Sequence, residues 1–120
     1  MIIKNIYPAF VTSDPKSTLE VLEKIGYKVI HINEGVLDKE NVEYVIEDAN
    51  SNRMDVVYSK NIKNTRQSVR MNVDNFEEAL NHFKNNGFEV LVGPDIKENY
   101  KCAFLKAANE FSILLYEHIK

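Results

Sequence analysis

Arg70 is the residue of this sequence best suited to polar recognition, because it lies in the middle of a strand-like segment, Arg66 to Val73. Side chains alternate between the two faces of a strand. Val69, Met71 and Val73 therefore share an apolar face, and the opposite face carries Ser68, Arg70 and Asn72. A guanidinium in that position can donate two parallel N–H bonds to a carboxylate or a similar acceptor.

The same alternation in other strand-like segments adds aromatic and apolar side chains to the Arg70 face: Tyr7, Ala9, Val11, Met54, Val56, Tyr58, Ser112, Leu114 and Tyr116. Tyr rings supply area for stacking, so this surface suits a flat or amphipathic small molecule. We therefore predict a ligand site built from Arg70, Tyr7, Tyr58, Tyr116, Ser68 and Met54. The open alternative is structural: Arg70 pairs with Asp55 or a nearby Glu, and the tyrosines fill a closed barrel.

Other chemistry has little support in the sequence. There is no G-x-G-x-x-G motif, no phosphate-binding loop and no nucleophile elbow. We interpret His31, on an inner strand, His82, on the polar face of a helix, and His118, near the C-terminus, as ordinary surface or edge residues. Cys102 has no neighbour that would activate its thiol, so we interpret it as a small core residue.

The composition predicts one globular domain. The chain has 120 residues, 44% of them apolar and 28% charged, with a net charge of −3. An acidic balance gives no electrostatic reason to bind nucleic acid. No apolar run reaches the roughly 18 residues of a membrane helix, and no signal peptide precedes the first strand-like segment. With a single cysteine, the chain is expected in the cytoplasm.

The order of predicted elements is the same in both halves of the chain. Residues 2–11 read as a strand, Asp14-Pro15 starts a helix that ends at Gly26, and three strands follow at 27–32, 41–47 and 53–59. The second half has a strand at 66–73, a helix from Asn75 to Gly87, and strands at 88–92, 100–105 and 111–118, with Gly93-Pro94 as a turn. We divide the single domain 1–120 into modules 1–60 and 61–120.

Aligned residues support a true repeat. Leu19, Leu22, Gly26, Tyr27 and Val29 recur as Leu80, Phe83, Gly87, Phe88 and Val90 at a constant spacing. A strand, an Asp-started helix ending in Ile25-Gly26-Tyr27 and three further strands, all present twice, resemble the vicinal oxygen chelate superfamily of glyoxalases, ring-cleaving dioxygenases and bleomycin-resistance proteins. The resemblance implies an α+β fold of two βαβββ modules, whose curved mixed sheet surrounds a pocket with the helices outside.

Enzymes of that superfamily usually bind a divalent metal through His, Glu or Gln on the first and last strands of each module. The resemblance places these positions at Tyr7, Val56, Ser68 and Leu114, none of which is a usual ligand for such a metal. A shift of one residue would add only Asp55 and Gln67. We therefore expect no metal and no cofactor, as in a bleomycin-resistance-like binding protein that lacks the metal ligands.

The sequence thus favours a metal-independent protein that binds a small hydrophobic or aromatic molecule, such as a drug or an aromatic metabolite. The alternative is a lyase or dioxygenase-like enzyme of the same superfamily with a degenerate or metal-free site. Modules of this superfamily pair with one another, and an isolated sheet exposes its edges, so we expect a homodimer without nucleic-acid or membrane partners.

Overall fold

The computed structural model describes residues 1–119 and contains the predicted order of elements twice. The first half comprises β1 (Ile3–Thr12), α1 (Pro15–Glu23), β2 (Lys28–Glu34), β3 (Val42–Glu47) and β4 (Arg53–Tyr58). The second half comprises β5 (Arg66–Val73), α2 (Phe76–Asn85), β6 (Glu89–Ile96), β7 (Tyr100–Lys106) and β8 (Ser112–His118).

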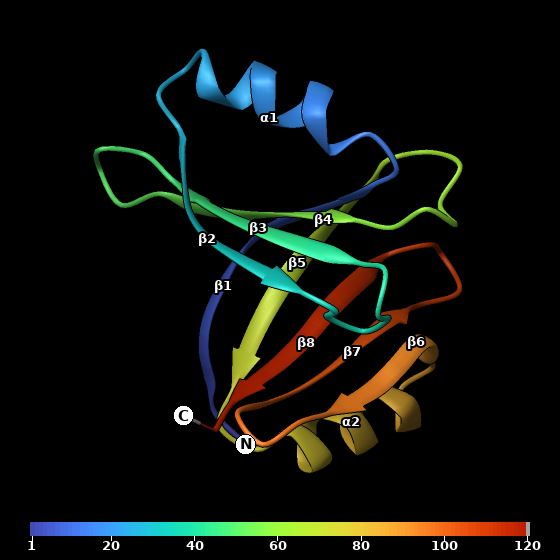
Figure 1. The fold of residues 1–120 in the computed structure, drawn as a ribbon. Coiled ribbons are helices and arrows are strands. Elements are labelled where there is room, and N and C mark those ends of the chain that lie inside the picture. The colour runs from blue at the N-terminus through green and yellow to red at the C-terminus, as the bar shows by residue number, and fades with distance from the viewer. Residues whose placement is uncertain (120) are drawn as a thin grey trace.

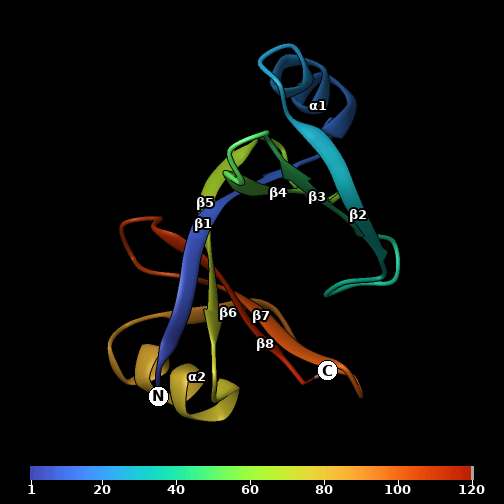
Figure 2. The ribbon, with the colours of Figure 1, turned by 90° about the vertical axis from the view of Figure 1, so that its left-hand side faces the viewer.

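The eight strands form one mixed sheet in the order β2-β3-β4-β1-β5-β8-β7-β6. The two halves join where β1 pairs antiparallel with β5, while β1–β4 and β5–β8 are parallel pairs. The sheet curls, and the helices lie on its outer side at opposite ends (Figures 1 and 2). The predicted α+β class and arrangement are confirmed.

Both helices begin and end as their sequences predict. The carboxylate of Asp14 accepts a hydrogen bond from the Ser17 N–H, and Pro15 occupies the first helical position. Asn75 caps α2 in the same way, through Glu78 N–H. After each helix the chain turns at a glycine with positive φ, Gly26 at 107° and Gly87 at 91°.

Each helix covers its own apolar cluster on the outer face of the sheet. Phe76 and Ala79 of α2 are buried together with the sheet side chains Met71, Val73, Ala103, Leu105, Ile113 and Leu115, and Leu80 and Phe83 of α2 pack against this cluster. The predicted apolar face of β5 is therefore confirmed. Leu19 and Leu22 of α1 pack against a different cluster, which contains Tyr27, Ile46 and Val56.

The prediction for β4 is wrong by one residue. Met54 and Val56 pack in the α1 cluster, so they lie on the outer face with Tyr58, while Asp55 and Val57 face the concave side. Alternation could not decide this register, because β4 has apolar side chains on both faces. The pairing of β4 with β1 decides which side chains face the concave side, because Asp55 lies beside Ala9 and Val56 lies beside Phe10.

Gly93-Pro94 is also not the predicted turn, because β6 continues through it to Ile96. The pairing with β7 shifts register between Val92 and Asp95, which accommodates the two residues within the strand. A side chain at Gly93 would come within 3.1 Å of the Asp95 amide nitrogen, so the position requires glycine.

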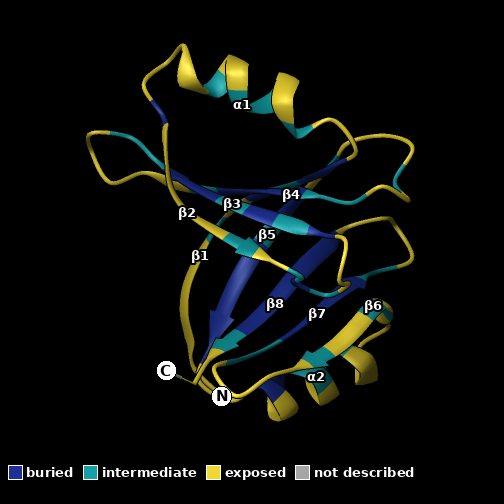
Figure 3. Cartoon of the chain, viewed as in Figure 1, coloured by how far each residue is buried: buried dark blue, intermediate teal, exposed yellow. Residues whose placement is uncertain are grey.

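Burial differs between the strands. The central strands β5 and β8 are mostly buried, whereas the edge strands β2 and β6 and the first half of the central strand β1 are largely exposed (Figure 3). Within residues 1–119, none of the helices has the length and apolar character needed to cross a membrane.

Candidate functional site

Arg70 lies at the centre of the concave face and is 2% exposed. Its Nη1 donates to Oδ2 of Asp55 at 2.7 Å and to Oε2 of Glu43 at 2.9 Å. Both carboxylates have no exposed surface. The structural alternative for Arg70 is therefore present: it pairs with Asp55 and with a nearby Glu.

The rest of the guanidinium is also engaged. Nε donates to Oδ1 of Asn72 at 3.1 Å, and Nη2 lies 2.9 Å from Nε2 of His118. The guanidinium carbon lies 3.7 Å from the centre of the Tyr116 ring and 5.6 Å from that of Tyr7. Four of the five N–H donors of Arg70 thus have partners among the described residues, and one Nη2–H remains for a ligand.

The buried surroundings of Asp55 change the pKa of its carboxyl group. Burial and the neighbouring Glu43 carboxylate raise its pKa to about 8, against the opposing effect of Arg70. Oδ1 of Asp55 is buried and has no hydrogen-bond partner within residues 1–119. A protonated Asp55 beside an ionised Glu43 makes the cluster with Arg70 neutral, because a second negative charge in this buried place would be costly.

His118 is held as a neutral acceptor by Arg70. An arginine N–H can only donate, so Nε2 of His118 must accept and the proton must lie on Nδ1. Burial and the Arg70 charge lower the pKa of His118. The His118 ring also packs against Tyr116, with 4.7 Å between the ring centres.

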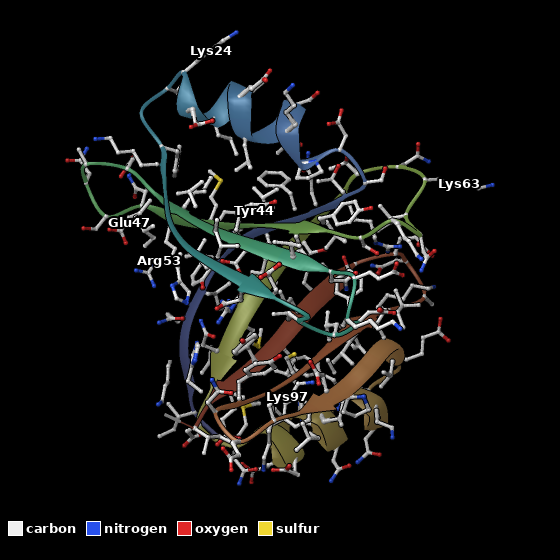
Figure 4. All side chains as sticks on the ribbon, viewed as in Figure 1. Lys24, Tyr44, Glu47, Arg53, Lys63 and Lys97 are labelled. Carbon is white, nitrogen blue, oxygen red and sulfur yellow. The ribbon has the colours of Figure 1, made fainter. Side chains whose placement is uncertain are left out.

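A cavity of about 380 Å³ lies beside this cluster, and we refer to it as the polar cavity. Its lining residues come from seven strands and one loop: Tyr7, Ile30, His31, Asn33, Val45, Arg53, Arg70, Asn99, Tyr100, Tyr116 and His118. At its outer side Arg53 donates to Glu47 at 2.9 Å, and the two residues lie close together near the sheet edge (Figure 4).

Three of the six predicted site residues line this cavity, namely Tyr7, Arg70 and Tyr116. Ser68 faces the concave side but is engaged with Ser112, with 2.5 Å between their hydroxyl oxygens. Met54 and Tyr58 lie on the outer face, as the β4 register dictates. The last two residues are therefore removed from the candidate site.

The sequence interpretation missed Glu43, His31, Tyr100 and His118. His118 could have been found, because it shares the alternation of Ser112 and Tyr116 along β8. His31 lies on the edge strand β2 rather than on an inner strand. Its place at the cavity depends on strand order and on the curl of the sheet, for which the sequence has no local signal.

The donor set does not fit the divalent metal that the superfamily resemblance implies. Of the four positions, Val56 faces away and Leu114 has no donor atom, while Ser68 is bonded to Ser112. The carboxylates that do reach the concave face, Glu43 and Asp55, bind a guanidinium instead. Within residues 1–119 no group of three or more His, Cys, Asp or Glu side chains is arranged to hold a metal ion.

The loop between β2 and β3 closes over the concave face. Val36 is fully buried against Cys102 and Tyr116, and the Leu37 N–H donates to Oδ2 of Asp95 at 2.9 Å. Burial raises the pKa of the Cys102 thiol to about 12, with a further contribution from Asp95. Cys102 is therefore a protonated core residue at neutral pH.

No protein-family model matches the sequence, and no curated protein does so. Solved structures match over nearly the whole chain. Methylmalonyl-CoA epimerase from Mycobacterium tuberculosis aligns with a TM-score of 0.68 and 11% identity, over 98% of this chain and 90% of that one. A variant of the epimerase from Streptomyces coelicolor, solved with 2-nitronate-propionyl-CoA, gives 0.67 and 11%, over 99% and 100%.

A glyoxalase I variant from Zea mays has a TM-score of 0.67 and 17% identity, over 94% of this chain. The match covers 42% of the glyoxalase chain, so this protein spans less than half of that length. At these identities the likeness is one of architecture. The chain thus has the fold of glyoxalase I and methylmalonyl-CoA epimerase.

Proposed function

We propose that this chain is a metal-independent binding protein for a small aromatic or amphipathic molecule, such as a drug or an aromatic metabolite, held in the polar cavity. The observation that carries the proposal is the Arg70–Glu43–Asp55 cluster. It places a permanent cation on the carboxyl groups of Glu43 and Asp55 at the centre of the concave face, and an aromatic cavity lies beside them.

The cavity walls indicate how such a ligand would be held. Tyr7 and Tyr100 offer partly exposed rings, and Tyr100 stacks on the buried Tyr116 ring with 5.3 Å between centres. The remaining Nη2–H of Arg70 and the side chains of His31 and Asn99 supply polar contacts. Because the buried cluster is neutral when Asp55 is protonated, the wall does not demand an anionic ligand. A neutral heteroaromatic with acceptor atoms fits this set.

A thermal-shift screen tests the proposal. The panel contains neutral heteroaromatics, aromatic acids, cationic aromatic drugs and divalent metals, because any true ligand stabilises the fold by mass action. We expect shifts from aromatic compounds and none from metals. A panel in which only metals raise the melting temperature would overturn the proposal.

Matched histidine variants locate the binding. His31→Ala removes a cavity side chain from an exposed position and should weaken an aromatic binder about tenfold. His82→Ala removes an exposed histidine from α2, which lines no cavity described above, and should leave the affinity unchanged. Equal losses in the two variants would place the binding elsewhere.

An enzyme is the second candidate, and the raised pKa of Asp55 favours it. A carboxyl group that titrates near neutral pH can act as a general acid or base. Two of the fold neighbours named above are epimerases, and epimerisation at a carbon requires proton removal and return. However, Asp55 has no exposed surface, so a substrate would need an opening of the concave face to reach it.

Solvent exchange distinguishes the two candidates. A thioester or ketone with an acidic C–H next to its carbonyl group is incubated with the protein in D₂O. That carbon would gain deuterium if Asp55 transferred protons, and Asp55→Asn would abolish the gain. We expect no exchange above the uncatalysed rate.

Because the single cysteine is buried and unpaired, we infer that the protein acts in the cytoplasm.

A further inference from the structure

The concave face contains a second cavity that shares no lining residue with the polar cavity. It has a volume of about 190 Å³. Most of its wall is apolar: Val11, Leu37, Val57, Ile62, Leu91, Val92, Phe104 and Leu114. The polar residues that line it are Asn41, Ser59, Asn61 and Arg66. We refer to it as the apolar cavity. An apolar cavity of about 150 Å³ is large enough to admit benzene.

Asn41 is an unusual residue in this wall. It is 7% exposed, and its backbone N–H and C=O are both bonded within the β2–β3 loop. Its side-chain amide has no hydrogen-bond partner within residues 1–119, and its nitrogen and oxygen are not among the fully buried unpaired atoms of that range. The amide is therefore accessible from the cavity that it lines. A polar group of a ligand in the cavity can pair with its donor or its acceptor.

Arg66 supplies a cation to the same cavity. Its Nη2 donates to the Glu110 carbonyl at 2.8 Å and to Oε1 of Glu110 at 3.1 Å. Within residues 1–119, Nε and Nη1 of Arg66 have no partner, so Nη1 can donate to a further acceptor. Lys106 also binds the exposed Glu110 carboxylate, which compensates part of its charge.

The outer surface next to Arg66 is basic as well. Ile62 and Arg66 line both the apolar cavity and a neighbouring surface hollow that includes Lys63. Lys63 extends outward from the loop between β4 and β5 (Figure 4). The hollow also includes Glu110, whose carboxylate is paired with Arg66 and Lys106, so the surface that an approaching anion meets carries a net positive charge.

We propose that the apolar cavity binds a compact apolar carboxylate, with one aromatic ring or a short branched chain. The apolar part fills the space between Val57, Phe104 and Leu114. The carboxylate accepts hydrogen bonds from Nη1 of Arg66 and from the Asn41 amide. A charge-assisted hydrogen bond to arginine favours a carboxylate over a neutral amide of the same shape. This site is distinct from the polar cavity of the proposed function.

Phenylacetate, phenylacetamide and phenethylamine are matched probes, because they share the ring and differ in the charge of the polar group. We expect phenylacetate to shift the methyl NMR signals of Val57 and Leu114 and to bind about tenfold more tightly than phenylacetamide. Arg66→Gln should remove that difference. Asn41→Leu should weaken both ligands. Phenethylamine that binds as tightly as phenylacetate would overturn the proposal.

Two tryptophan variants at exposed positions of β6 distinguish a loss of binding from a loss of folding. Leu91 lines the cavity and is 40% exposed, so Leu91→Trp fills the space from the surface and should abolish phenylacetate binding. Ile96 lies on the same strand, is 55% exposed and does not line the cavity, so Ile96→Trp should bind normally. His31→Ala should also have no effect. Phenylacetate binding that survives Leu91→Trp, or that is lost in His31→Ala, would overturn the assignment.

Discussion

The hydrogen bond from Nη1 of Arg70 to Oδ2 of Asp55, at 2.7 Å, connects the two halves of the chain. Arg70 belongs to β5 and Asp55 to β4, with β1 between these strands in the sheet. Both side chains are buried. The pair therefore supports the curvature of the concave face as well as its charge balance.

Loss of the Arg70 cation should destabilise the fold. Arg70→Met leaves two buried carboxyl groups without their cation, and breaking a buried pair in this way costs about 3–5 kcal/mol. Urea denaturation measures the loss of unfolding free energy. Adding Glu43→Gln and Asp55→Asn to Arg70→Met should restore much of it, because no buried charge then remains. An unchanged urea midpoint for Arg70→Met would contradict this view of the pair.

Asp55 should make stability depend on pH. Its pKa is about 8 in the folded protein, compared with an ordinary value of 3.8. Between these values the folded protein keeps a proton that the unfolded chain has released. The free energy of unfolding contributed by this group therefore falls as the pH rises from about 4 to about 8.

Urea titrations at several pH values test this dependence. The difference between wild type and Asp55→Asn isolates the group, and we expect a negative slope in wild type that the variant lacks. Glu47→Gln is the control, because Glu47 is the last residue of β3 and pairs with exposed Arg53. Equal slopes in wild type and Asp55→Asn would show that Asp55 ionises normally.

The protein is predicted to be independent of metal. Protein purified without chelator should contain no stoichiometric Ni, Zn, Mn or Fe by elemental analysis, and EDTA should not change its melting temperature. The physical reason is that Arg70 already engages Glu43 and Asp55. One equivalent of bound metal that is lost in Asp55→Asn would refute this prediction.

The homodimer also remains a prediction. The edge strand β2 exposes Ile30 at 48% and Ile32 at 53%, and α1 is followed by Ile25 at 70%. Unpaired apolar edges favour association. Light scattering at tens of micromolar should give twice the chain mass, and Ile32→Glu should give the monomer. A wild-type monomer at that concentration would contradict the prediction.

Cys102 should be inert in the folded protein. Its thiol is fully buried, and its pKa is raised to about 12, so thiolate is scarce at pH 8. A thiol-specific chromogenic reagent should react at least about a hundredfold faster in urea than in native buffer. Fast reaction of the native protein would show that the β2–β3 loop opens readily.

Local signals in the sequence were sufficient to predict the element order and the side chains of half of the concave face. Asp14 and Asn75 identify the helix starts, and Gly26 and Gly87 their ends, because capping and left-handed turns depend on neighbouring residues only. In β5 the strict alternation of Val69, Arg70 and Met71 assigned each side chain to the correct face. The element order and the position of Arg70 follow from such short-range rules, whereas the arrangement of two βαβββ modules was inferred from the superfamily resemblance.

Tertiary structure decided the face of β4 and the partners of Arg70. Residues 54–58 carry apolar side chains on both faces, so no periodicity distinguishes Met54 from Asp55, and the pairing of Ala9 with Asp55 settles the register. Glu43 and His118 reach Arg70 from strands 27 and 48 residues away in sequence. Contacts of that separation depend on strand order and sheet curvature, which arise from the packing of the whole chain.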